Sequence, residues 1–181
     1  MYYQTRVPSP VGELTLACDG AKEHLVGVWM AGQKYHGNTI AEEMEQQDDI
    51  ALFAAARQWL DAYFAGKRPG MDALPLAPIG GEFRQGVWSI LRQIPYGQVI
   101  TYGDIARQMA QRMGRDGMSS QAVGGAVGHN PISIIIPCHR VVGANGSLTG
   151  YAGGIPTKIK LLQLEGVDMS RLFVPKKGTA L

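Results

Sequence analysis

Cysteine and long apolar runs are scarce in this chain of 181 residues. Its two cysteines, Cys18 and Cys138, are too few for a disulfide framework or a cysteine-rich zinc site, so we expect no metal. No apolar run approaches the roughly 18 residues of a membrane-spanning helix, and the first residues lack the pattern of a secretory signal. With 45% apolar and 18% charged residues, the chain is neither disordered nor fibrous. We expect a reduced, cytoplasmic protein, no membrane partner and a real hydrophobic core.

Charge is divided unevenly along the chain. Residues 1–82 contain 6 lysines and arginines against 11 aspartates and glutamates, a net charge of −5. Residues 83–181 contain 11 against 4, a net charge of +7. This asymmetry indicates two units, the second facing an anion such as nucleic acid. An ordinary solvated basic surface is the alternative, because many basic domains bind no nucleic acid.

The acidic half predicts antiparallel strands followed by one helix. The expected strands cover 2–7, 13–18 and 24–30, which are rich in β-branched and aromatic residues and separated by turn sequences. A helix is expected over 50–65, with Asp49 as its cap and Gly66 at its end. Residues 66–82, with three prolines and four glycines, are typical of a linker.

The basic half predicts a series of helices. Apolar residues recur at helical spacing over 83–94, and Thr101 and Asp104 stand in capping-box positions for the next helix. After a loop, a serine at 119 or 120 opens a short helix over 121–128 made of small residues. This arrangement suits a helix-turn-helix, and a packed helical hairpin has the same pattern. The glycine-rich loop 143–150 is a candidate wing, and a last helix follows from Pro156.

Cys138 is the sharpest chemical feature. It stands between Pro137 and His139-Arg140, after an apolar run. A lone cysteine is usually a small buried hydrophobe, but cationic neighbours favour the nucleophilic thiolate. A carboxylate that orients a histidine, which takes the thiol proton, would complete the relay. Glu165 is the candidate, although sequence spacing alone does not bring it beside His139.

These residues resemble the active-site motif of the O6-alkylguanine-DNA alkyltransferases, also called methylated-DNA–protein-cysteine methyltransferases. Other blocks fall in the family's order: 83–88, 94–97, Thr101-Tyr102, 122–124, Asn130-Pro131 and 150–154. The resemblance implies an α/β protein with an amino-terminal ribonuclease-H-like sheet domain and a carboxy-terminal winged helix-turn-helix domain. We expect the first domain over 1–75, a linker over 76–82, the second over 83–170 and a tail over 171–181.

The resemblance implies direct-reversal repair of double-stranded DNA through the minor groove by a monomer without a cofactor. Cys138 would take the alkyl group from O6 of a flipped guanine in a single turnover. His139 would accept the thiol proton through a water, and Glu165 would orient its imidazole. Asn130 would bridge the recognition helix to the active-site turn, and Tyr102 would contact the flipped nucleotide.

Further positions follow from the same resemblance. The substrate pocket would be formed by Tyr102, Gln121, Val141, Tyr151, Ala152 and Gly153. The carbonyls of Cys138 and Val141 would read the exocyclic amine of guanine. Gln121 stands where the family usually has an arginine that inserts into the duplex, and it lacks that residue's planar cation. Candidate phosphate contacts are Arg84, Arg112 and Arg115.

Three other functions remain open on the sequence. A non-catalytic protein that recognises alkylated bases is one, although relatives of that kind lack the reactive cysteine. A transcription regulator with the same winged domain is another. A cysteine hydrolase is the third, and it would turn over without retaining a label.

Overall fold

The computed structural model describes residues 1–176 and divides the chain into two compact units. The first contains Met1–Gly80 together with Pro131–Ile135, and the second contains Gly81–Asn130 and the chain from Ile136 onward. The last five residues of the expected tail lie outside the described residues. Within residues 1–176, no helix combines the length and apolar character needed to cross a membrane.

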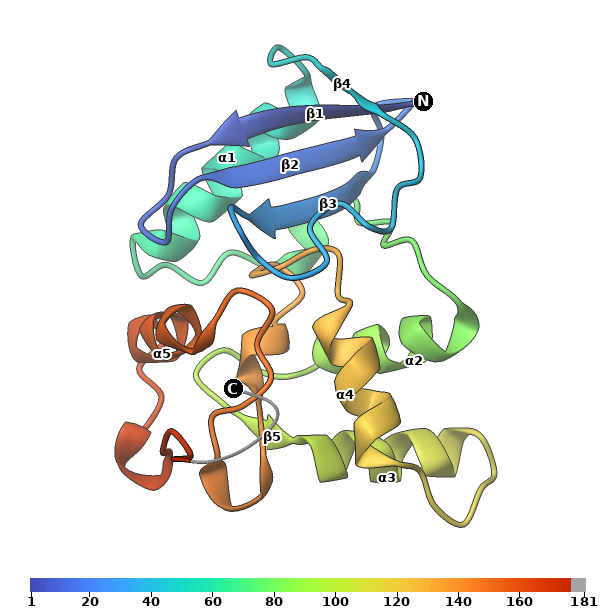
Figure 1. The fold of residues 1–181 in the computed structure, drawn as a ribbon. Helices are drawn as coiled ribbons and strands as arrows, with labels where there is room; N and C mark the ends of the chain where they lie inside the picture. Colours follow the sequence, from blue (N-terminus) through green and yellow to red (C-terminus); the bar gives the residue numbers. More distant parts are fainter. Residues whose placement is uncertain (177–181) are drawn as a thin grey trace. The chain divides into compact units, whose positions relative to one another are not determined.

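A four-stranded sheet forms the framework of the first unit, in the order β3-β2-β1-β4 (Figure 1). The strands are β1 (Tyr2–Val7), β2 (Leu14–Asp19), β3 (Leu25–Met30) and β4 (Met44–Gln46). The first three pair in antiparallel order, as the sequence predicts. β4 runs parallel to β1 and was not predicted, because three residues are too few for a strand pattern. Every residue of β3 is buried.

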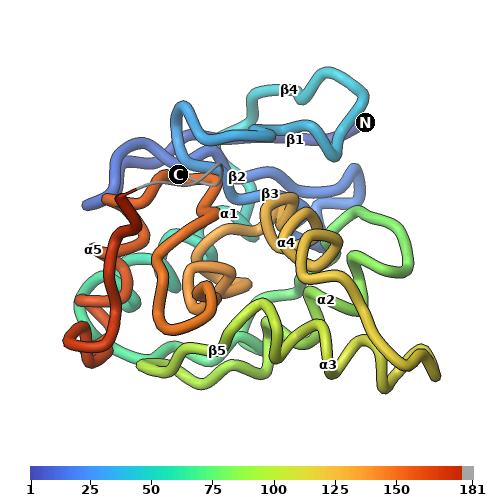
Figure 2. Tube along the Cα trace, turned by 60° about the horizontal axis from the view of Figure 1, so that its bottom comes forward, coloured from blue at the N-terminus to red at the C-terminus, as the bar shows by residue number. Residues whose placement is uncertain are grey.

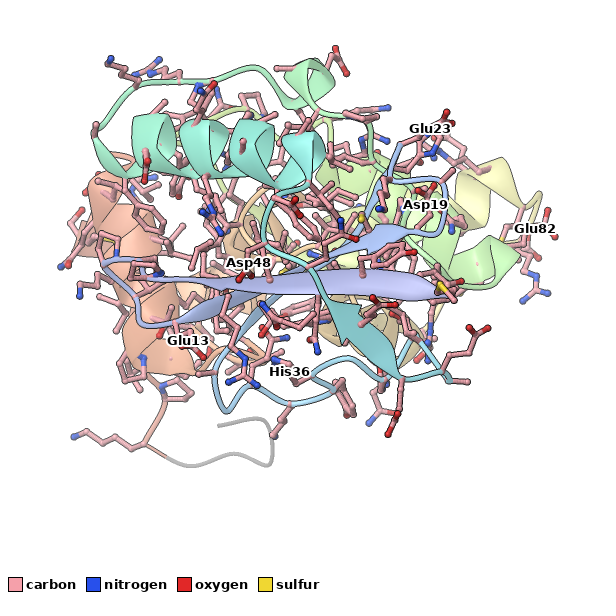
Figure 3. All side chains as sticks on the ribbon, turned by 90° about the horizontal axis from the view of Figure 1, so that it is seen from above. Glu13, Asp19, Glu23, His36, Asp48 and Glu82 are labelled. Atoms are coloured by element: carbon pink, nitrogen blue, oxygen red, sulfur yellow. The ribbon has the colours of Figure 1, made fainter. Side chains whose placement is uncertain are left out.

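Helix α1 (Ala51–Phe64) buries one apolar stripe and ends near Gly66, which has a φ of 80°. The prediction that Asp49 caps this helix is wrong. The cap position is Ile50, which makes no side-chain cap hydrogen bond. The neighbouring Asp48 accepts a hydrogen bond from Thr5 Oγ1 at 2.6 Å, so the segment before α1 is attached to β1 (Figure 3).

Two segments outside the regular strands pair with β3. Leu25 donates its N–H to Pro75 O at 2.8 Å and accepts from Ala77 N at 2.9 Å, within the stretch where the sequence predicts the domain end and a linker. Val28 likewise donates to Pro131 O at 2.9 Å and accepts from Ser133 N at 3.0 Å. The sheet of the first unit is therefore completed by residues from much later in the chain.

The second unit contains the helix-turn-helix that the sequence predicts. Its helices are α2 (Glu82–Leu91), α3 (Tyr102–Arg112), α4 (Ser120–Gly128) and α5 (Ile155–Leu164). Short strands β5 (Ile100–Thr101) and β6 (Val141–Val142) pair in parallel. The loop between α3 and α4 projects from one end of the unit (Figure 2). With the sheet of the first unit, these helices confirm the α/β class.

Local capping signals explain where the two central helices begin. The hydroxyl of Thr101 accepts from Asp104 N at 3.0 Å, and the Asp104 carboxylate accepts from Thr101 N at 2.9 Å. This is the predicted capping box. Ser119 caps α4 through the N–H groups of Gln121 and Ala122. The first turns of both helices lie next to the glycine-rich loop 143–150, which we call the wing loop. A 2.7 Å hydrogen bond from Gly143 N to Ser147 O closes this loop.

The ring of Trp29 covers Gly27 on one face of β3. A Cβ atom at Gly27 would lie 2.1 Å from the Trp29 ring, and both residues are buried. We predict that Gly27→Ala lowers the free energy of unfolding by about 1–3 kcal/mol, because the ring has to move within a packed core. Urea denaturation measures this loss. Gly70→Ala is the control, since its Cβ enters open space. Equal stability of the two variants would contradict the prediction.

Candidate active site

Cys138 lies at the start of a short 3₁₀ turn, Cys138–Arg140. Its N–H donates to Ile136 O at 2.8 Å across Pro137, whose φ of −83° and ψ of 64° form an inverse γ-turn. The Asn130 side chain donates to the same carbonyl at 2.8 Å. Asn130 follows the last residues of α4, so it connects that helix to the turn that carries the cysteine. Cys138 is only 5% exposed.

The structure brings Glu165 next to His139, which sequence spacing left open. Glu165 stands directly after α5, and its Oε1 lies 3.0 Å from His139 Nε2. Arg140 also binds this carboxylate, through Nε at 2.9 Å to Oε2 and Nη2 at 2.6 Å to Oε1. All three side chains are buried. Such a bidentate ion pair holds the carboxylate in one orientation.

This network sets the protonation states of Glu165 and His139. Although burial opposes ionisation of Glu165, hydrogen bonds from His139 and Arg140 and their charges lower its pKa to about 2. Burial lowers the pKa of His139, since complete desolvation outweighs the contribution of Glu165. The imidazole is therefore neutral near pH 7. When Nε2 donates to Glu165, Nδ1 carries a lone pair that can accept a proton.

Burial, and not the cationic residues next to it in sequence, has the largest effect on the protonation of Cys138 in the resting protein. Burial raises the pKa of the Cys138 thiol, and this outweighs the hydrogen bonds and charge that lower it. The guanidinium of Arg140 is directed elsewhere, to Glu165 and to Ile94 O at 2.7 Å. The cation that lowers the thiol pKa is Lys158.

Sequence reasoning missed Lys158. This lysine lies in α5 and is 0% exposed. Its Nζ donates to Thr149 O at 3.0 Å and to Val141 O. The signal was present in the sequence, because residues three and four positions further along, Leu161 and Leu162, form the buried face of the same helix.

A groove of about 780 Å³ lies beside the start of α3, α4 and the wing loop. Tyr102 and Gln121, two of the predicted substrate contacts, line it. The Tyr102 hydroxyl donates to Thr149 O at 3.1 Å. Burial and the nearby Cys138 raise the pKa of Tyr102, so its hydroxyl stays protonated. Of the other predicted substrate contacts, Val141 lies in β6, and Tyr151, Ala152 and Gly153 lie in the glycine-rich turn before α5. Val141 and Tyr151 are buried, and Ala152 and Gly153 are partly exposed.

The predicted phosphate-binding arginines differ in their surroundings. Arg112 donates to Ser89 Oγ at 2.7 Å, so its side chain is attached to α2. Arg84 is partly buried, and Arg115 is exposed beside a second groove of about 610 Å³. Arg107, which sequence reasoning did not single out, lines both grooves and pairs with Asp104.

Comparison with known families covers nearly the whole chain. Residues 1–78 match the model described as "6-O-methylguanine DNA methyltransferase, ribonuclease-like domain". Residues 82–167 match "6-O-methylguanine DNA methyltransferase, DNA binding domain". These two matches correspond to the sheet domain and the helix-turn-helix domain predicted from the sequence.

Individual relatives give the same result. A methylated-DNA–protein-cysteine methyltransferase of Methanosarcina acetivorans is 44% identical over 92% of this chain and 99% of its own. The Haemophilus influenzae protein of that name is 40% identical over 91% of this chain and 87% of its own. The crystal structure of Mycobacterium tuberculosis OGT in complex with DNA is 40% identical, covers 94% of each chain and has a TM-score of 0.75.

Ionised Glu165 stabilises the fold, and this contribution depends on pH. Its pKa falls from a usual 4.5 to about 2, so the stabilisation is complete above pH 4.5 and disappears as pH falls toward 2. We predict that Glu165→Gln lowers the free energy of unfolding by about 3 kcal/mol at pH 7 and by progressively less below pH 4.5. Urea denaturation across pH measures this. Asp168→Asn, at an exposed carboxylate beyond the same helix, should change little; a pH-independent loss in Glu165→Gln would contradict the prediction.

Proposed function

The chain belongs to the 6-O-methylguanine DNA methyltransferase family, and from this we propose that Cys138 is the residue that accepts the alkyl group. The observation that carries the proposal is the buried cysteine followed by a neutral histidine whose Nε2 is held by Glu165. A nucleophilic thiol needs a base oriented by a third group, and these residues supply all three parts.

The reaction is a displacement at the alkyl carbon. Sγ of Cys138 forms a bond to that carbon as the carbon–O6 bond breaks, and the electron pair of the broken bond stays with guanine. The thiol proton passes to Nδ1 of His139, directly or through a water, and guanine takes up a proton to become the ordinary base. Because Cys138 is protonated in the resting protein, proton transfer has to accompany or precede the attack.

The product remains on the protein. An S-alkylcysteine is a thioether without a carbonyl, so no water attack comparable to hydrolysis of an acyl-enzyme regenerates the thiol. Each molecule therefore acts once. This separates the proposal from a cysteine hydrolase, which releases its product, and from a non-catalytic recognition protein, which transfers nothing.

The burial of Cys138 requires that the damaged base leave the stack. The sulfur of a cysteine that is only 5% exposed cannot reach O6 inside a duplex, so we propose base flipping from the minor groove into the groove beside Tyr102 and Gln121. The carbonyls of Cys138 and Val141 would read the exocyclic amine of guanine. Tyr151, Ala152 and Gly153 would line the remainder of the base pocket.

The nucleic-acid contacts outside the pocket are electrostatic. Arg84, Arg112 and Arg115 are the candidates for phosphate binding, to which we add Arg107 because it lines the groove. Asn130 would hold the active-site turn against α4 while the base is bound. We place the protein in the cytoplasm, where reducing conditions keep Cys138 a free thiol.

We predict that incubation with duplex DNA containing O6-methylguanine adds one methyl group to Cys138 and none to Cys18. Mass analysis of the two cysteine-containing peptides measures this, because each cysteine lies in a separate segment. Cys18 is an internal control, since burial and Asp19 raise its pKa to about 11. Methyl on Cys18, repair by Cys138→Ser, or more than one equivalent repaired per protein would overturn the assignment.

Gln121 should fill part of the space left by the flipped nucleotide. It is exposed at the start of α4 and lines the groove. We predict that Gln121→Ala slows repair of duplex DNA by about tenfold, on the scale of one lost stacking contact, and leaves transfer from free O6-methylguanine unchanged. Gln121→Arg should match or exceed the native rate on duplex, because arginine adds charge and a stacking plane.

Rates of both reactions in single-turnover assays test the role of Gln121. Gln163→Ala, at an exposed glutamine on α5 outside the groove, is the matched control and should behave as the native protein on both substrates. If Gln121→Ala repairs duplex at the native rate, this side chain does not occupy the gap.

A further inference from the structure

The wing loop contacts two different parts of the second unit. The residues at its two ends line the groove of about 780 Å³ that the proposed reaction uses: Gly143, Ala144, Asn145, Thr149 and Gly150. The three residues between them, 146–148, pair instead with the chain that follows α5. The loop is therefore attached by its middle to residues 169–173, which we call the carboxy-terminal segment.

The attachment is a short β-bridge between Ser147 and Phe173. Phe173 donates its N–H to Gly146 O at 3.1 Å, and Leu148 donates its N–H to Phe173 O at 2.8 Å. Gly146 lies close to the facing backbone, since a Cβ atom at this position would be 2.1 Å from Arg171 O. Figure 1 shows the chain after α5, in red, beside the orange wing loop.

A small apolar cluster joins the wing loop to α5 and to the carboxy-terminal segment. Its buried members are Val142, Leu148 and Leu162, and the side chains that pack against it include Met169 and Leu172. Burial of apolar surface therefore holds the segment against the wing loop together with the two hydrogen bonds.

The backbone of the wing loop explains why an attachment is needed. Asn145 and Gly146 are consecutive residues with φ values of 60° and 87°, in the left-handed region. Asparagine tolerates this region and glycine enters it freely, but a loop rich in glycine has many other accessible conformations. Pairing with Phe173 selects one of them, and in this conformation Asn145 lines the groove.

We propose that the carboxy-terminal segment is a positioning element for duplex DNA, because it holds the wing loop in the conformation that binds the duplex. The inference rests on the proposed reaction with duplex DNA. Among the described residues that line the groove, none belongs to the segment, so the segment acts through the wing loop. A loop that is ordered before binding loses less entropy when DNA arrives, which raises affinity and leaves the chemistry at Cys138 unchanged.

Phe173→Pro tests the proposal, because proline has no N–H to donate to Gly146 O and its ring occupies the place of that hydrogen. Leu172, the preceding residue, already has the extended backbone that proline requires, with a φ of −106° and a ψ of 145°. Phe173→Ala is the matched control, since it removes the same exposed ring and keeps the N–H. Single-turnover assays give the maximal rate, the duplex concentration for half of that rate, and the rate with free O6-methylguanine.

We expect Phe173→Pro to raise the duplex concentration for the half-maximal rate about tenfold, on the scale of one or two lost hydrogen bonds. The maximal rate and the rate with the free base should stay native, since neither depends on capture of the duplex. Phe173→Ala should match the native protein throughout. Native behaviour of Phe173→Pro overturns the proposal, as does an equal loss on the free base or an equal effect of Phe173→Ala.

The wing loop offers an independent variant. Gly146→Ala places a Cβ atom against Arg171 O and opens the bridge from the other side. Gly66→Ala is its control, because Gly66 has a φ of 80° and open space at the Cβ position, so it carries the backbone strain without the clash. Gly146→Ala should reproduce the effect of Phe173→Pro, and Gly66→Ala should not. A native dependence on duplex concentration in Gly146→Ala contradicts the inference.

Hydrogen exchange keeps the proposal testable if both bridge variants fail to fold. Coupling is reciprocal, so a bridge that favours duplex binding about tenfold is itself favoured about tenfold by bound duplex. Exchange of the Leu148 amide is followed by NMR in Cys138→Ser, with and without duplex containing O6-methylguanine. The reference is the Arg92 amide, which donates to Trp88 O at the end of α2.

We expect bound duplex to slow exchange at Leu148 about tenfold more than at Arg92. Equal slowing at the two amides shows that the bridge and the DNA are not coupled and overturns the inference. Failure of the proposed function gives a different result: no protein acquires methyl on Cys138, while duplex binding measured by fluorescence anisotropy is still weaker for Phe173→Pro than for Phe173→Ala.

Discussion

The buried carboxylate of Glu165 is the interaction on which the active site depends. It accepts from His139 and from two guanidinium nitrogens of Arg140, so one group determines the orientation of two consecutive side chains. Arg140 supplies the balancing charge, and the imidazole can therefore remain neutral and act as a base. Because Glu165 directly follows α5, the position of that helix and the chemistry at Cys138 are set by the same ion pair.

Local signals in the sequence predicted a large part of the fold. The Thr101–Asp104 capping box predicted one helix start, and the serines at 119 and 120 predicted the next to within one residue, because capping depends on neighbours within one turn. The antiparallel strands followed from composition and turns. β4 and the pairing of Leu25 with residues 75–77 were not predictable, since both depend on contacts between segments far apart in the chain.

The sequence likewise predicted some parts of the candidate site and not others. The motif around Cys138 was enough to propose a nucleophile and its histidine, because those residues are adjacent in sequence. Neighbours in sequence were a poor guide to the charge that acts on the Cys138 thiol. The guanidinium of Arg140 is directed to Glu165. The cation that lowers the pKa of the thiol is Lys158, twenty residues later in the chain. A side chain's direction and its loss of water depend on tertiary packing, so neither the raised thiol pKa nor the buried lysine follows from a linear pattern.

The late segment 131–135 affects how the protein is synthesised. Its backbone pairs with Val28 of β3, yet it leaves the ribosome about fifty residues after Gly80, where the first stretch of that unit ends. Until then, the nascent first unit has an open β3 edge, and its partner segment holds Ile134 at a φ of 72°, which a β-branched residue rarely adopts. The amino-terminal unit therefore cannot complete its fold during translation before residues 131–135, shortly before Cys138, have emerged.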